Sequence, residues 1–143
     1  MNVLFYLPVT SKIDARIQEV VEMAGSMAKT EVFRSIKDFS IRLCRPDGSP
    51  TIAVLLAGNK IDLVDFAFIR NLLSDTPIIL VLPDREESTA TIGYALLPRF
   101  LTYMDGNLME IGAVLEKMIK YYEEKNVTKE QEIDSNCELL VTC

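Results

Sequence analysis

Short runs of apolar residues recur along the chain, and segments with helical spacing separate them. Continuous apolar runs of this length are typical of strands that are buried on both faces of a parallel sheet. On this basis we predict strands over residues 2–7, 30–36, 52–57, 78–82 and 100–104. The second run is the weakest, because Glu31 and Arg34 interrupt it.

A helical segment follows each predicted strand. The apolar stripes that we expect to face the core are Ile13, Ile17, Val20 and Ala24 in the first helix, Ile61, Val64, Phe68 and Leu72 in the third, and Leu108, Ile111, Leu115, Met118 and Tyr122 in the fifth. The expected capping residues are Ser11, Asp38, Asn59 or Asp62, and Asn107 with Glu110. The segment 85–97 is a poor helix, because two threonines and a glycine precede Pro98.

Strict alternation of five strands and five helices predicts a parallel sheet with helices on both faces and right-handed crossovers. At a length of 143 residues the common solution is a flavodoxin-like, doubly wound α/β sheet with strand order 2-1-3-4-5. We expect one such domain over residues 1–124 and an acidic tail over 125–143. Residues 123–143 contain six acidic and two basic residues, which favours a solvated end. Alternatively, residues 139–141 add a strand or dock on a partner.

The amino-acid composition excludes several classes of function. Hydrophobic residues make up 49% of the chain, and the net charge of −6 argues against binding of nucleic acid through phosphates. The chain contains no histidine, which excludes the usual catalytic triads and most catalytic zinc sites. No apolar run is long enough for a membrane span and the start lacks a signal peptide, so we expect a cytoplasmic protein with no membrane association. Accordingly, the three cysteines are interpreted as reduced thiols.

Ligands of open parallel sheets bind outside the carboxyl ends of the strands, so the loops at those ends are candidate sites. The segment AGNKIDL at 57–63 resembles the guanine-specificity motif of small GTPases, but the glycine-rich phosphate loop of that family has no counterpart after the first strand. An anion such as flavin phosphate could bind at Thr10 and Ser11, although capping alone explains Ser11. Carboxylates after strand ends could hold Mg²⁺ or Ca²⁺, although each also suits a cap or turn. The candidate ligand-binding residues are therefore Thr10, Ser11, Asn59, Asp62, Asp84 and Asp105.

Residues 2–122 resemble the receiver domain of two-component response regulators. The resemblance rests on the element order and on the segments RPDGSPTIAVLLA, TPIILVLP and FLTYMDGNLMEIGAVLEKMIKYY. In that family, acidic residues after the first strand bind magnesium, an aspartate at the end of the third strand accepts the phosphoryl group, and a Thr or Ser and a Lys follow in the last two strands. The matching positions here are uncharged: Leu7, Pro8, Leu56 or Ala57, Leu82, and Tyr103 with Met104. The resemblance therefore implies a degenerate receiver that is not phosphorylated on aspartate and needs no cofactor.

Function would then reside on surfaces. Receivers pair or bind partners through their fourth helix, fifth strand and fifth helix, and the resemblance implies the same face here: Tyr94, Leu96, Leu97, Arg99, Tyr103, Lys117 and Tyr121. Leu96 and Leu97 could instead pack inward. The third helix also carries Leu63, Phe66 and Ile69 beside its stripe, which favours a protein partner or a homodimer there. The alternative function is a small-ligand or metal-binding protein, or an enzyme, that uses the strand-end loops.

Overall fold

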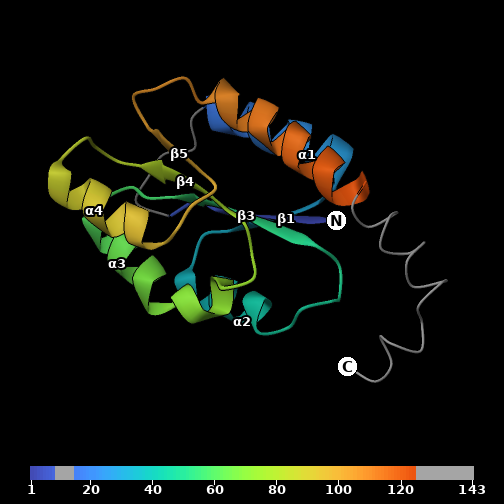
Figure 1. Ribbon diagram of the computed structural model, residues 1–143, viewed down its shortest axis with the longest axis horizontal. Helices are drawn as coiled ribbons and strands as arrows, with labels where there is room; N and C mark the ends of the chain where they lie inside the picture. Colours follow the sequence, from blue (N-terminus) through green and yellow to red (C-terminus); the bar gives the residue numbers. More distant parts are fainter. Residues whose placement is uncertain (9–14, 125–143) are drawn as a thin grey trace.

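The computed structural model describes residues 1–8 and 15–124. Its five parallel strands are β1 (Asn2–Tyr6), β2 (Lys29–Phe33), β3 (Thr51–Leu56), β4 (Ile78–Leu82) and β5 (Phe100–Tyr103). They form one sheet in the order β2-β1-β3-β4-β5, so the predicted flavodoxin-like architecture is confirmed (Figure 1). The two central pairings align Asn2 with Thr51 and Ala53 with Ile78.

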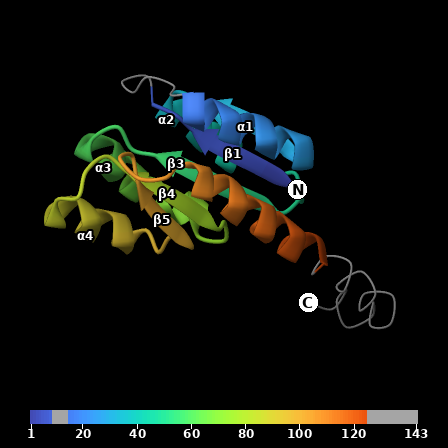
Figure 2. The same ribbon diagram turned by 90° about the horizontal axis from the view of Figure 1, so that it is seen from above.

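Helices cover both faces of the sheet. They are α1 (Ala15–Met27), α2 (Ile36–Leu43), α3 (Lys60–Phe68), α4 (Glu87–Ala95) and a last helix over residues 109–124. A 3-10 turn, η1 (Arg70–Leu73), follows α3. Helix α1 and the last helix lie side by side on one face, and α2, α3 and α4 cover the other (Figures 1 and 2). No helix in the described part of the chain has the length and apolar character that crossing a membrane requires.

Alternation along the strands divides the core into two layers. Val3, Phe5 and Leu7 face α1 and the last helix, where Leu108, Ile111, Leu115 and Ile119 complete this layer. Leu4 and Tyr6 face the opposite way and pack with Phe39 of α2 and Phe66 of α3. The predicted stripes of the first and last helices are thus correct where they are described, while Ile13 lies outside the described residues.

The predicted core stripe of the third helix is wrong. Its members are exposed, from 37% for Leu72 through 43% for Val64 and 70% for Ile61 to 83% for Phe68. The core side of α3 and η1 instead consists of Leu63, Phe66 and Leu73, with half-buried Ile69 beside them. Both sets of residues fit helical spacing, because this segment is apolar around most of its circumference.

Two further predicted boundaries differ. The strand expected over 30–36 ends at Phe33, because Ser35 caps α2 by accepting a hydrogen bond from the Asp38 backbone N–H (3.4 Å). The segment 85–97 contains a regular helix, α4, over Glu87–Ala95 despite its low helix propensity. Buried Thr89 and Gly93 face the sheet, so tertiary packing stabilises this helix. The two leucines at its end diverge: Leu96 is buried and Leu97 is exposed.

Candidate functional site

The carboxyl edge of the sheet, the usual ligand site in this architecture, is lined by apolar side chains. Leu7, Leu56 and Leu82 are at most 3% exposed, and Pro8 and Ala57 are buried as well. Leu7, Leu56, Ala57 and Leu82 belong to the two core layers, so these described positions offer no charged or hydrogen-bonding side chain to a ligand. A carboxylate or an ammonium group is absent from each of these positions.

Tyr103, at the end of β5, lies under a cation. The Arg85 guanidinium stacks over its ring at 4.1 Å from the centroid and also forms a two-pronged ion pair with Asp105, with N···O distances of 3.1 and 3.0 Å. The Arg85 partner lowers the pKa of Asp105 below its ordinary value. The carboxylate of Asp105 therefore neutralises the Arg85 guanidinium of the same chain, and this ion pair accounts for Asp105 without a ligand.

Asp84 and the start of α4 also form hydrogen bonds and an ion pair within the protein. Asp84 accepts a hydrogen bond from the Glu86 backbone N–H (2.9 Å). The Thr89 hydroxyl, which does not reach full hydrogen-bond geometry, and this N–H lower the pKa of Asp84. Glu86 in turn pairs with Lys60 at the start of α3, which raises the pKa of Lys60. These contacts tie the loops after β3 and β4 to each other.

Asn59 and Asp62 cap α3. The Asn59 Oδ1 accepts a hydrogen bond from the Asp62 backbone N–H (3.0 Å), and the Asp62 Oδ2 accepts one from the Gly58 backbone N–H (2.8 Å). Asp62 is only 8% exposed. Burial, together with Asp62 and Asp65, raises the pKa of the neighbouring Tyr6. This capping accounts for Asn59 and Asp62 of the AGNKIDL segment without a nucleotide.

The remaining ligand candidates, Thr10 and Ser11, lie outside the described residues. Within the part of the chain that is described, no three His, Cys, Asp or Glu side chains come together as a metal ion would require. Asp62, Asp84 and Asp105 thus follow neighbouring strands as predicted, but each serves a helix start or an ion pair.

The other candidate site is the surface around α4, β5 and the last helix. Leu97 is 82% exposed and Tyr94 is 60% exposed. Leu97, Arg99 and Tyr122 line a hollow of about 220 Å³, and Leu97 also borders a groove of about 310 Å³ beside η1. Phe66, which was expected at an interface, is instead fully buried, and Tyr103 lies at the opposite end of β5.

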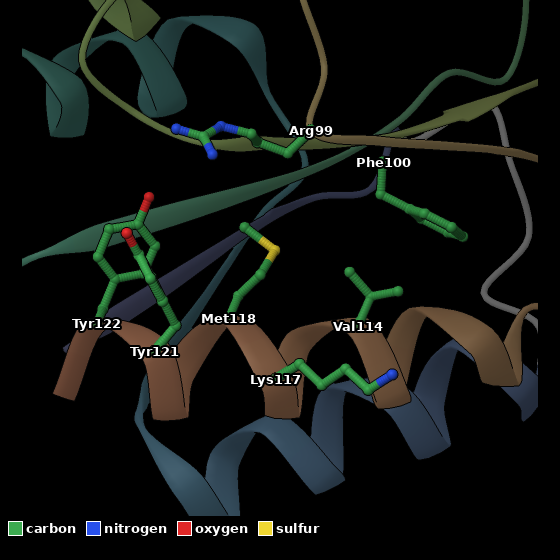
Figure 3. A pocket seen from close by; sticks show the side chains of 7 residues that line it. All are labelled: Arg99, Phe100, Val114, Lys117, Met118, Tyr121 and Tyr122. Atoms are coloured by element: carbon green, nitrogen blue, oxygen red, sulfur yellow. The ribbon is translucent and has the colours of Figure 1, made fainter. Parts of the chain in front are cut away.

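Four of the predicted interface residues therefore lie along one continuous surface at the amino end of β5. Arg99, Lys117 and Tyr121 line a pocket of about 340 Å³ between β5 and the last helix, and Arg99 joins it to the hollow beside Leu97. Figure 3 shows Arg99 opposite the helix, Met118 pointing from the helix into the gap, and the two tyrosines together at one end. The tyrosine rings meet edge to face, with centroids 5.4 Å apart. The complete lining is Arg99, Phe100, Val114, Lys117, Met118, Tyr121 and Tyr122.

No known protein family model matches the chain. No curated protein resembles it significantly either. The arrangement of its own residues is thus the basis for any functional conclusion.

Sequence reasoning missed Phe100, Val114 and the roles of Met118 and Tyr122 in this pocket. The helical spacing placed Met118 and Tyr122 on the core side, and both indeed pack against the core. β5 is an edge strand of four residues, so the sheet ends beside them and leaves their outer sides uncovered. Spacing identifies the inward side of a helix, but it contains no information about where the sheet below that helix ends.

Proposed function

We propose that this protein is a receiver-like interaction module whose activity does not depend on aspartate phosphorylation. The observation that carries the proposal is the set of buried, uncharged side chains at the carboxyl edge of the sheet. Leu56 and Ala57 occupy the end of β3, where the resemblance to receivers expects the phosphoryl acceptor. Phosphoryl transfer needs an acceptor carboxylate, a divalent ion and a cation for the phosphoryl oxygens, and these positions supply none of them.

The exposed surface beside β5 supports a role in binding a protein partner or a second copy. Leu97 has a left-handed backbone (φ 54°), which is unfavourable for a leucine, and its side chain is 82% exposed. An apolar side chain held outward in a strained conformation favours a functional role over a packing role. Tyr94 and Arg99 nearby are of the residue types that dominate binding energy at protein interfaces.

The phosphorylation part of the proposal is tested with acetyl phosphate and Mg²⁺, and separately with beryllofluoride. Intact-mass spectrometry and amide NMR spectra are recorded, with an authentic receiver domain treated in parallel as the positive control. We expect neither a phosphoryl adduct nor shifts around Ala57 and Tyr103. An adduct on an aspartate, or beryllofluoride-induced shifts confined to the carboxyl edge, would refute the proposal.

The interaction part is tested by comparing partner capture from extracts of the source cells. Leu97→Asn combined with Tyr94→Ala should abolish capture of proteins that the wild type retains, because the two substitutions remove exposed side chains of the proposed interface. Asparagine tolerates the left-handed backbone at this position, so the variant should keep its fold. Ile61→Asn, which removes an apolar side chain that is 70% exposed on α3, is the matched control and should leave capture unchanged. Loss of capture in the control alone would move the interaction surface to α3.

A further inference from the structure

The pocket between β5 and the last helix combines an apolar floor with positive charge. Phe100, Val114 and Met118 supply apolar surface, while Arg99 lies on the β5 side and Lys117 on the helix side, with their charged ends pointing toward opposite ends of the pocket (Figure 3). No acidic side chain is among the described residues that line it. Its volume of about 340 Å³ falls in the range of pockets that hold a few side chains or a small ligand.

The two cations of this pocket have no ion-pair partner among the described residues, in contrast to several other cations of the protein. Arg42 pairs with Glu31, Arg85 with Asp105, and Lys120 with Glu116. Within the described residues, neither Arg99 nor Lys117 forms an ion pair. In a chain with a net charge of −6, two unpaired cations around one apolar pocket are a recognition feature for an acidic and apolar group.

A segment with the complementary composition belongs to the same chain. Residues 130–141 (EQEIDSNCELLV) contain no basic residue, and they combine acidic with aliphatic side chains. The acidic residues are Glu130, Glu132, Asp134 and Glu138, and the aliphatic ones are Ile133, Leu139, Leu140 and Val141. These residues lie outside the described part of the chain.

We propose that the acidic segment, residues 130–141, binds in the pocket formed by Arg99, Lys117, Met118 and the two tyrosines of the same molecule. Its aliphatic side chains would cover Phe100, Val114 and Met118, and its carboxylates would pair with the two cations. The described chain ends at residue 124, directly after Tyr121 and Tyr122 of the pocket. The residues between 124 and 133 can span up to about 30 Å, so the segment easily reaches the pocket.

Covalent attachment favours this occupant over a separate molecule. A short tether gives a binding segment an effective concentration on the order of millimolar, so even weak complementarity fills the pocket. Because Arg99 also lines the hollow beside Leu97, a bound segment would compete with a partner for the same surface. This regulatory consequence rests on the proposed function, whereas the binding of the segment does not.

The experiment measures proximity in the full-length chain. In Cys44→Ser/Cys137→Ser, a nitroxide spin label is attached to Cys143, just beyond the segment, and amide NMR intensities are compared with the label reduced and oxidised. We expect the signals of Phe100, Val114 and Met118 to lose roughly half of their intensity or more. In the control variant, Cys137→Ser/Cys143→Ser, the label is on exposed Cys44 after α2, and these signals should remain unchanged.

Two further measurements complete the test: reversal of the charges at Arg99 and Lys117, and a mixture of two differently labelled protein samples. Arg99→Glu/Lys117→Glu should restore the intensities at Val114 and Met118, and Lys117→Gln at raised salt provides the same test if the double variant is unfolded. Intensity losses that are absent, spread evenly over the protein or insensitive to these changes would overturn the proposal. So would equal losses in a mixture of spin-labelled protein and isotope-labelled protein without a spin label, since these would show binding to a second copy. None of these outcomes depends on phosphorylation or on capture of a partner.

Discussion

At the scale of single residues, α3 shows that two phenylalanines two positions apart have opposite environments. Phe66 is fully buried and packs edge to face against Tyr6, with ring centroids 5.2 Å apart. Phe68 is 83% exposed. Helical spacing alone predicted the stripe that contains Phe68 as the core side. Substitutions of Phe66 and Phe68 therefore distinguish this prediction from the observed orientation of the helix.

We expect Phe66→Ala to lower the free energy of unfolding by about 3–5 kcal/mol, because it removes a buried aromatic ring and leaves a cavity. Phe68→Ala should change it by no more than about 0.5 kcal/mol. Urea denaturation followed by circular dichroism measures both. Similar losses in the two variants would mean that Phe68 is covered in solution, for example by a second copy.

Asp47 carries a residue-scale prediction for pH. Its carboxylate accepts hydrogen bonds from the buried Asn2 amide (2.9 and 2.8 Å) and the Ser49 backbone N–H (2.9 Å), and these lower the pKa of Asp47. A folded-state pKa below the unfolded value, about 3.9, means that the stabilisation is present above that pH and is lost as the pH falls through the folded-state value. We therefore expect the melting temperature to fall less steeply below about pH 4 in Asp47→Asn than in the wild type.

The measurement is thermal unfolding across the acid range. Asp75→Asn is the matched control, because Asp75 is exposed and makes no side-chain hydrogen bond within the described residues. Asp75→Asn should leave unchanged how steeply the melting temperature falls with decreasing pH. Since Asp84 and Asp105 also have lowered pKa values, some acid sensitivity should persist in the Asp47 variant. Identical pH profiles for Asp47→Asn and the wild type would contradict the predicted linkage.

At the scale of elements, the two helical glycines of α1 and α4 differ in their surroundings. A Cβ atom at Gly25 in α1 would meet nothing within 4 Å. At Gly93 in α4 it would lie 2.9 Å from one methyl of Leu82 and 3.2 Å from one of Leu80. The exposed glycine thus serves no packing purpose, whereas the buried one lets α4 approach β4 closely.

Gly25→Ala should raise the free energy of unfolding by about 0.5–1 kcal/mol, the usual difference in helix propensity. Gly93→Ala should show no such gain, because the propensity gain is offset by displacement of the two leucines. Denaturant titrations of the two variants test this. A gain of the same size at both sites would mean that the leucines move aside without cost.

Element by element, the sequence predicts strands better than helix orientation. Runs such as 78–82 are buried on both faces, so continuous apolarity alone locates β4. The orientation of α3 depends on a choice between two apolar sides, which the pattern leaves open. The pocket beside β5 depends on residues from two elements and on the end of the sheet, and these are properties of the tertiary structure.

At the scale of the whole molecule, the sheet separates two core layers. Ile111 of the last helix belongs to one layer and Ile78 of β4 to the other, and both are buried. Ile111→Val and Ile78→Val should each cost about 0.5–1.5 kcal/mol. Because the two side chains contact different layers, the double variant should equal their sum within about 0.5 kcal/mol. Chemical denaturation of the three variants measures this, and a coupling above about 1 kcal/mol would show that the layers repack together.

The late position of the last helix has a consequence for biosynthesis. Ribosomes make the chain from its amino end, so α2, α3 and α4 are available to shield their side of the sheet before the last helix emerges. Until then, Val54, Leu56, Ile79 and Val81 have α1 as their only helical cover among the described elements. A nascent chain at that stage exposes an aggregation-prone apolar surface, which is the kind of surface that molecular chaperones bind.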